Sequence, residues 1–136
     1  KPYVIELAAR LSGGYFCTHE IPLNTGVDLV GAAIRQSLGE KIDTNELMPK
    51  FNRPVAQRYL FPKPGKVNSI NLPKWALSDP DISLLEVRIN KGDTIEPVTN
   101  HPARAGVVIT TGNEISNAIN KAESVISSIE IVMEPH

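Results

Sequence analysis

The sequence predicts an α+β fold in two lobes, and three patterns support this prediction. Residues 3–11 alternate between two faces, as a β-strand does. Residues 27–38 and 115–126 repeat apolar side chains every three or four positions, as a helix does. After Pro54, short apolar runs alternate with turn residues. We therefore expect antiparallel strands plus a helix, packed with a small β-rich lobe that carries one long helix.

Composition limits the classes of partner. The 136 residues suffice for one domain or two small lobes, and 41% of them are hydrophobic, so no metal or disulfide is needed for folding. Cys17 is the only cysteine. The formal net charge of −1 argues against nucleic-acid binding, because both signs are spread along the chain. No apolar run approaches the roughly 20 residues of a membrane span. We expect a cytoplasmic protein with no nucleic-acid or membrane partner.

The first lobe begins with the alternating strand, which Ser12-Gly13-Gly14 ends because adjacent glycines permit a sharp turn. Residues 15–23 predict a loop or a short strand. Thr25 is the expected N-cap of the first helix, with Asp28 completing a capping box, and Gly39 is expected to end this helix. The apolar stripe of the helix consists of Val27, Val30, Ile34 and Leu38.

The second lobe is expected to follow a polar linker that ends near Pro54, which divides the chain into residues 1–50 and 54–136. Tight-turn residues at 62–65 and 90–93 separate the expected strands. Asn113 is the expected cap of the long helix. The predicted strands are residues 55–61, 66–70, 84–89, 105–111 and 129–133.

Glu6 and Arg10 are the candidate functional residues of the first strand, because they are the charges on an otherwise apolar segment. Residues four apart on a strand are separated by roughly 13 Å, so these two side chains are placed to flank a ligand rather than to neutralise each other. The alternative is an edge strand whose charges face water. The residues alone leave both interpretations open.

The continuation of this strand resembles a known superfamily. Residues 4–14, followed by Thr25-Gly26-Val27-Asp28, resemble the end of the catalytic region of ATP-grasp ligases, where a Glu-X-Asn-X-Arg strand precedes a glycine loop and a Thr-Gly-X-Asp helix start. The second lobe looks like the C-terminal domain of the L-amino-acid ligase branch, through residues 58–67, 91–93 and 104–109. The resemblance implies that residues 1–50 end the catalytic domain and that residues 54–136 form the C-terminal lobe.

The resemblance also implies a chemistry. Such ligases use ATP and Mg²⁺ to join a small carboxylic or amino acid to an amine through an acylphosphate. By this resemblance Glu6 is a magnesium ligand, Arg10 is the catalytic residue that steadies the phosphate, and Ser12, Gly13 and Gly14 bind substrate phosphate through backbone N–H groups. Ala8 stands where most members have a metal-binding Asn, which favours the amino-acid branch and leaves open a lowered activity.

The elements that bind the nucleotide in ATP-grasp enzymes precede this strand, and the sequence contains neither a Walker loop nor Gly-X-Gly-X-X-Gly. The chain also begins at Lys1 rather than Met. We therefore expect a fragment of a ligase, inactive alone, with the adenine and phosphate elements in the full-length parent. Self-association is expected, because the first strand and one helix face lack cover.

Other residues have structural interpretations. Cys17 and His19 are interpreted as a packed small residue beside a loop histidine, not as a nucleophile and its base. Trp75 is interpreted as a packing anchor and Arg104 as a structural residue of the second lobe. Two alternatives to an amino-acid ligase remain: a biotin-carboxylase-like or carbamoyl-phosphate-synthase-like member, and a stand-alone interaction module without catalytic activity.

Overall fold

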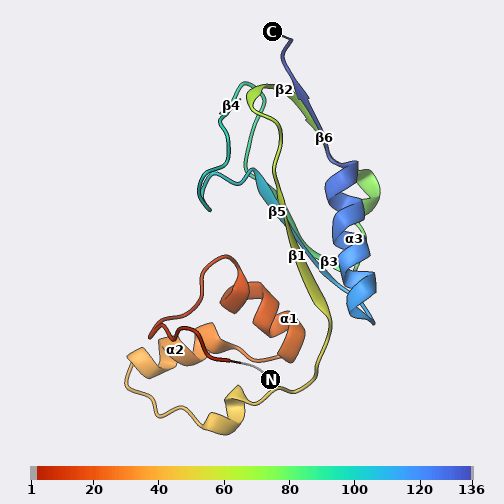
Figure 1. The fold of residues 1–136 in the computed structure, drawn as a ribbon. Coiled ribbons are helices and arrows are strands. Elements are labelled where there is room, and N and C mark those ends of the chain that lie inside the picture. Colours follow the sequence, from red (N-terminus) through yellow and green to blue (C-terminus); the bar gives the residue numbers. More distant parts are fainter. Residues whose placement is uncertain (1–2, 136) are drawn as a thin grey trace. The chain divides into compact units, whose positions relative to one another are not determined.

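The structure is a computed structural model that describes residues 3–135, and Figure 1 shows its ribbon. The chain divides into two compact units, Lys1–Asn52 and Arg53–His136, which are described separately. The described residues form three α-helices and two three-stranded antiparallel sheets. The predicted α+β class is therefore confirmed.

The first unit is helical. A π-helix, Phe16–Glu20, runs directly into α1, Ile21–Thr25, and α2 spans Leu29–Ser37 (Figure 1). A 3₁₀-helix covers Thr44–Leu47. The prediction of a loop or strand at residues 15–23 is therefore wrong, because Pro22 lies in the first turn of α1, where its missing N–H costs no hydrogen bond.

The helix predicted after residue 25 is present, but its cap differs from the prediction. Asp28 is the N-cap of α2, and its Oδ1 accepts a hydrogen bond from the Gly31 N–H at 2.8 Å. Thr25 instead ends α1, where its hydroxyl donates to the Ile21 carbonyl at 2.7 Å. Gly26 has a φ of 74° and separates the two helices, since this left-handed conformation favours glycine.

The strand predicted at residues 3–11 does not form. The structure gives this segment no strand conformation, and a hydrogen bond from the Arg10 N–H to the Ala8 carbonyl closes a short turn within it. None of the described strands pairs with the segment. Alternation of side chains favours a strand, but a strand also needs a neighbour for its backbone hydrogen bonds.

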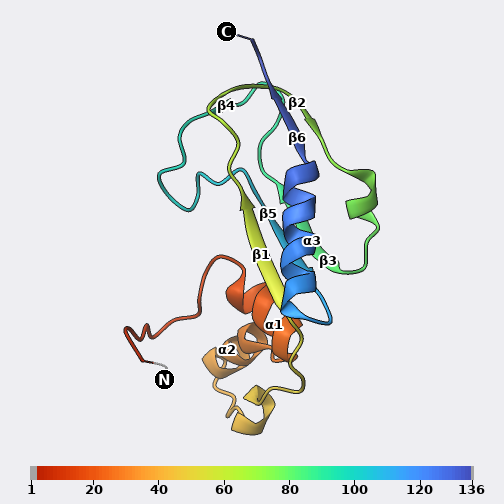
Figure 2. The ribbon, with the colours of Figure 1, turned by 45° about the vertical axis from the view of Figure 1, so that its right-hand side comes forward.

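The main sheet of the second unit contains β1, Val55–Leu60, then β5, Gly106–Thr111, then β3, Ile82–Val87, in that spatial order. Both pairings are antiparallel, and all six residues of the central strand β5 are buried. Helix α3, Ile115–Ser128, runs along this sheet (Figure 2). The apolar core between them includes Ala56, Val108, Ala118, Ala122 and Val125.

A second sheet has the order β4, Thr94–Ile95, then β2, Gly65–Asn71, then β6, Glu130–Met133. A 3₁₀-helix, Lys74–Leu77, follows β2 and leaves Trp75 partly exposed, so this residue is not a buried anchor. The longer strands lie within three residues of their predicted bounds, whereas the two-residue strand β4 was not predicted.

Polar contacts hold α3 in place. The helix begins after Glu114, not after the predicted cap Asn113, and the Glu114 N–H donates to Asn117 Oδ1 at 3.1 Å. The buried Thr110 hydroxyl donates to the Ala118 carbonyl at 2.7 Å. None of the helices in residues 3–135 has both the length and the apolar character that crossing a membrane requires.

Candidate functional site

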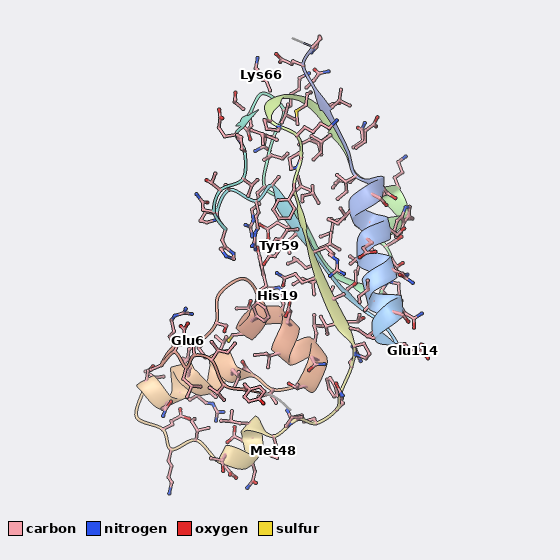
Figure 3. All side chains as sticks on the ribbon, viewed as in Figure 1. Glu6, His19, Met48, Tyr59, Lys66 and Glu114 are labelled. Atoms are coloured by element: carbon pink, nitrogen blue, oxygen red, sulfur yellow. The ribbon has the colours of Figure 1, made fainter. Side chains whose placement is uncertain are left out.

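Glu6 and Arg10 lie on the exposed segment that precedes the first helix (Figure 3 labels Glu6). Within the described residues, the Glu6 carboxylate takes part in no hydrogen bond or ion pair. The Arg10 guanidinium donates only one hydrogen bond there, from Nη1 to the adjacent Leu11 carbonyl at 3.3 Å. Both charged groups are therefore accessible to a ligand.

The turn at residues 12–14 leads from this segment into the π-helix. The Ser12 N–H already donates to the Sγ atom of Cys17 at 3.2 Å, so it is engaged within the protein. The Gly13 carbonyl accepts a hydrogen bond from the Phe16 N–H at 3.5 Å. No other atom lies within 4 Å of the position that a Cβ would occupy at Gly13, which leaves this backbone open to an approaching group.

Backbone strain follows this turn directly. Gly14 and Tyr15 have φ values of 66° and 73°, and Tyr15 is the one non-glycine residue with positive φ in the described part of the chain. Bulky residues rarely adopt this conformation, and it often occurs at functional sites. Apart from the adjacent glycines, no sequence pattern predicts this conformation, and the π-helix beside it was likewise not predicted.

Cys17 and His19 do not form a nucleophile and base pair. Cys17 is buried, and its sulfur accepts the Ser12 N–H. The His19 ring contacts Thr18 Oγ1 at 2.9 Å and meets Tyr15 edge-on, with 5.2 Å between ring centroids. The structure thus agrees with a packed Cys17, whereas His19 lies in the π-helix and not in a loop.

Glu20 is the last residue of the π-helix, and its surroundings shift the pKa of its carboxyl. Burial raises the pKa of the Glu20 carboxyl, because desolvation disfavours the charged form. No basic group contributes to this shift. Glu20 is therefore easier to protonate than an exposed glutamate.

The segment at residues 3–11 offers a divalent cation one carboxylate ligand. Among the described residues, no cluster of three or more His, Cys, Asp or Glu side chains could hold a metal ion. Mg²⁺, however, is usually held by one or two carboxylates together with substrate phosphates. The accessible Glu6 carboxylate fits this chemistry as a single hard oxygen ligand.

The second unit contains a polar cavity of about 540 Å³ along α3, which the sequence did not predict. Lys121 is one of its lining residues, and its Nζ atom pairs with Asp79 at 2.6 Å and with Asp81 at 3.7 Å. Because the acidic groups near it are paired with Lys121, the cavity offers amide and hydroxyl groups rather than an acid and a base. Its lining consists of Asp81, Gly112, Asn113, Asn117, Asn120, Lys121 and Ser124.

Arg104 has a partner within its own unit. Its guanidinium carbon lies 3.8 Å from the centre of the Tyr59 ring, which is a cation–π contact (Figure 3 labels Tyr59). Tyr59 belongs to β1 and Arg104 to the loop before β5. This contact agrees with the structural role expected for Arg104.

Comparison with known proteins places these features in context. A family model described as L-amino acid ligase C-terminal domain 2 matches residues 58–134. The structure is similar to an L-amino acid ligase from Bacillus licheniformis, with a TM-score of 0.78 and 16% identity over 98% of this chain and 33% of that chain. It is also similar to phosphoribosylglycinamide synthetase from Anaerococcus prevotii, with a TM-score of 0.71 and 19% identity over 87% of this chain and 30% of that chain.

A comparison with curated proteins found no match. At these identities the two solved structures show a shared fold. The chain spans about a third of the length of each. The family model, in contrast, covers more than half of this chain.

Proposed function

Because this chain belongs to the L-amino acid ligase family of ATP-grasp enzymes through its C-terminal domain 2, we propose that it supplies the C-terminal third of an ATP-dependent carboxylate–amine ligase. Residues 1–50 would end the catalytic domain, and residues 54–136 would form the C-terminal lobe. The match to the amino-acid branch is the observation that carries this proposal. It favours an amino-acid substrate over the carboxylase-like and carbamoyl-phosphate-synthase-like alternatives.

The proposed reaction has two steps. A carboxylate oxygen of the acid attacks the γ-phosphorus of ATP and releases ADP, which gives an acylphosphate. The nitrogen of the amine then attacks the acyl carbon, loses a proton and expels inorganic phosphate. The remaining two thirds of the ligase would bind the adenine and most of the triphosphate, so we expect this chain alone to be inactive.

Glu6 would hold the metal ion through its accessible carboxylate. Mg²⁺, when bound, offsets the negative charge on the phosphoryl group that is transferred. With Ala8 two residues away, the segment offers no second oxygen side chain at that position. Glu6 would therefore be the main attachment of the metal to this segment.

Arg10 would bind the phosphate of the acylphosphate through its planar, permanently charged guanidinium. The support is that its guanidinium makes only one hydrogen bond, to the Leu11 carbonyl, in the described part of the chain. Since the Ser12 N–H already donates to Cys17, the backbone of Gly13, which has open space beside it, would make the phosphate contact at the turn.

The test measures amino-acid-dependent ADP release by the ligase that contains this chain. Glu6→Gln keeps the side-chain shape but removes the charge. Arg10→Lys keeps the charge but removes the planar guanidinium that can make two parallel hydrogen bonds to a phosphate. We expect kcat to fall about a hundred- to a thousandfold for each, as is typical when a group that faces developing charge is lost. Glu40→Gln and Arg35→Lys repeat the same chemical changes at an ion pair of the first unit that lies outside residues 3–14, and they should leave kcat unchanged.

Turnover within a fewfold of wild type for both site variants would overturn the catalytic roles. Glu6 and Arg10 would then be solvated charges, as in a non-catalytic interaction module. A large effect of the two control variants would instead point to damage to the fold of the first unit.

A further inference from the structure

Tyr15 occupies a position whose backbone conformation suits glycine better. Gly13 and Gly14 precede it, and a third glycine would adopt the φ of 73° without steric cost. A tyrosine in this left-handed region is strained, because its Cβ crowds the backbone carbonyl oxygen. Such a residue persists only where the surrounding structure holds it. We therefore looked for contacts of the Tyr15 ring that offset the strain.

The ring of Tyr15 packs against the π-helix that follows it. It meets the His19 ring edge-on, with 5.2 Å between ring centroids, which is an arrangement that aromatic pairs prefer (Figure 3 labels His19). The Tyr15 carbonyl also accepts the N–H groups of His19 and Glu20, at 2.9 Å and 3.0 Å. Both the side chain and the backbone of Tyr15 thus contact the π-helix, Phe16–Glu20.

The turn before Tyr15 is attached to the same helix by two hydrogen bonds. The Ser12 N–H donates to Sγ of Cys17 at 3.2 Å, and the Gly13 carbonyl accepts the Phe16 N–H at 3.5 Å. Cys17 is buried, so its sulfur cannot move without repacking of the first unit. Because Tyr15 joins the turn to the helix, a change in its φ would displace the turn and break both hydrogen bonds.

The open side of this turn lies at Gly13. Apart from its two chain neighbours, nothing lies within 4 Å of the position that a Cβ would occupy there. In the proposed ligase, the backbone of Gly13 contacts the phosphate that is transferred. A group that faces developing charge is most effective when it is already fixed in position, because no energy is then spent on reorienting it. The proposed role of Gly13 therefore requires a rigid turn.

We propose that Tyr15 is a positioning residue of the ligase site. Its ring, packed against His19, keeps the left-handed backbone that fixes the turn at Gly13. This inference rests on the proposed function for the role of Gly13, whereas the rigidity of the turn is a property of the first unit alone. The rigidity is tested by hydrogen exchange and the ligase role by ADP release, so either can fail alone.

The first experiment measures hydrogen exchange of backbone N–H groups by NMR in the 136-residue chain. The Ser12 N–H should exchange roughly tenfold faster in Tyr15→Gly than in wild type, because the turn opens more often without the ring. Tyr15→Phe keeps the ring and should exchange as wild type does. The Gly31 N–H, which donates to Asp28, is the internal control and should not change. Equal exchange of the Ser12 N–H in all three proteins would overturn the proposal.

The second experiment measures amino-acid-dependent ADP release by the ligase that contains this chain. We expect Tyr15→Gly to lower kcat roughly tenfold with the KM for the amino acid unchanged, because the turn stabilises the phosphate only as it is transferred. Tyr15→Phe keeps the ring and should keep kcat within about twofold of wild type. His101→Ala removes an exposed histidine ring of the second unit and is the control, with kcat unchanged.

A purely structural role of Tyr15 predicts a different result. Glycine relieves the backbone strain, which offsets the lost ring contact, so the urea midpoint of Tyr15→Gly should stay close to that of wild type while kcat falls. A midpoint that falls together with kcat, or an unchanged kcat, would overturn the positioning role. Glu6→Gln distinguishes this failure from failure of the proposed function. If Glu6→Gln lowers kcat and Tyr15→Gly does not, only the role of Tyr15 is wrong.

Discussion

The Nζ atom of Lys121 lies 2.6 Å from Oδ2 of Asp79, and this ion pair joins α3 to the loop before β3. The hydrogen bond from Lys121 is the main reason that the pKa of Asp79 is lowered, and the same bond raises the pKa of Lys121. The Asp79 carboxylate also accepts the Asp81 N–H at 2.9 Å, so it orders the loop as well. One carboxylate thus connects the loop to the helix that covers the main sheet.

Removing this ion pair should destabilise the second unit modestly. We expect Lys121→Met to lower the free energy of unfolding by about 1 kcal/mol or less, because the pair is only partly shielded from water. A double-mutant cycle with Asp79→Asn, measured by urea unfolding, isolates the coupling between the two side chains. Lys91→Met removes an exposed lysine outside this contact and should have no effect. Additive effects of the two site variants would show that the pair contributes nothing.

The pairing of β5 with β3 should not tolerate a side chain at Gly106. A Cβ at this position would overlap the backbone carbonyl of Glu86 on the neighbouring strand. Because backbone atoms cannot rotate away, we expect Gly106→Ala to lower the free energy of unfolding by about 1–3 kcal/mol. Denaturant unfolding with an unchanged slope would show that only stability has changed. A variant as stable as wild type would mean that β3 can shift without loss.

Neutralising Glu20 should stabilise the first unit in a pH-dependent way. A carboxyl with a raised folded-state pKa contributes stability below its unfolded pKa, and this contribution is lost as pH rises through the folded pKa. We therefore expect Glu20→Gln to increase the free energy of unfolding at pH 7 by about 0.5 kcal/mol and to have no effect near pH 3. Urea unfolding at both pH values measures this. A loss of stability at pH 7 would contradict the desolvation argument.

The sequence correctly predicts the elements whose apolar side-chain pattern matches the way they pack in the fold. The stripe of Ala118, Ala122 and Val125 indicated α3 correctly, because these side chains form the core against the main sheet. Alternation at residues 3–11 indicated a strand that is absent, since a pattern of side chains carries no information about whether a partner strand exists. The π-helix at Phe16–Glu20 follows a strained turn at Tyr15, and no repeat of apolar side chains in the sequence predicts this turn.

The same distinction applies to the candidate sites. Glu6 and Arg10 were identified from their isolation on an apolar segment, and the structure leaves both accessible. Their roles stay predictions. The cavity on α3 was missed because Asp81 and Asn117 are distant in sequence and meet only when the helix packs beside the loop before β3. Contacts of this kind arise from tertiary packing rather than from local spacing.

The central position of β5 determines when the second unit can fold during synthesis. Its neighbours β1 and β3 are translated first, and each leaves its inner edge without a partner until residues 106–111 emerge. The helix that covers the sheet is translated later still. Because these pairings join distant parts of the chain, the unit cannot form strand by strand. Its folding waits until residues 106–128 have left the ribosome, and until then two unpaired strands remain exposed to chaperones and to other nascent chains.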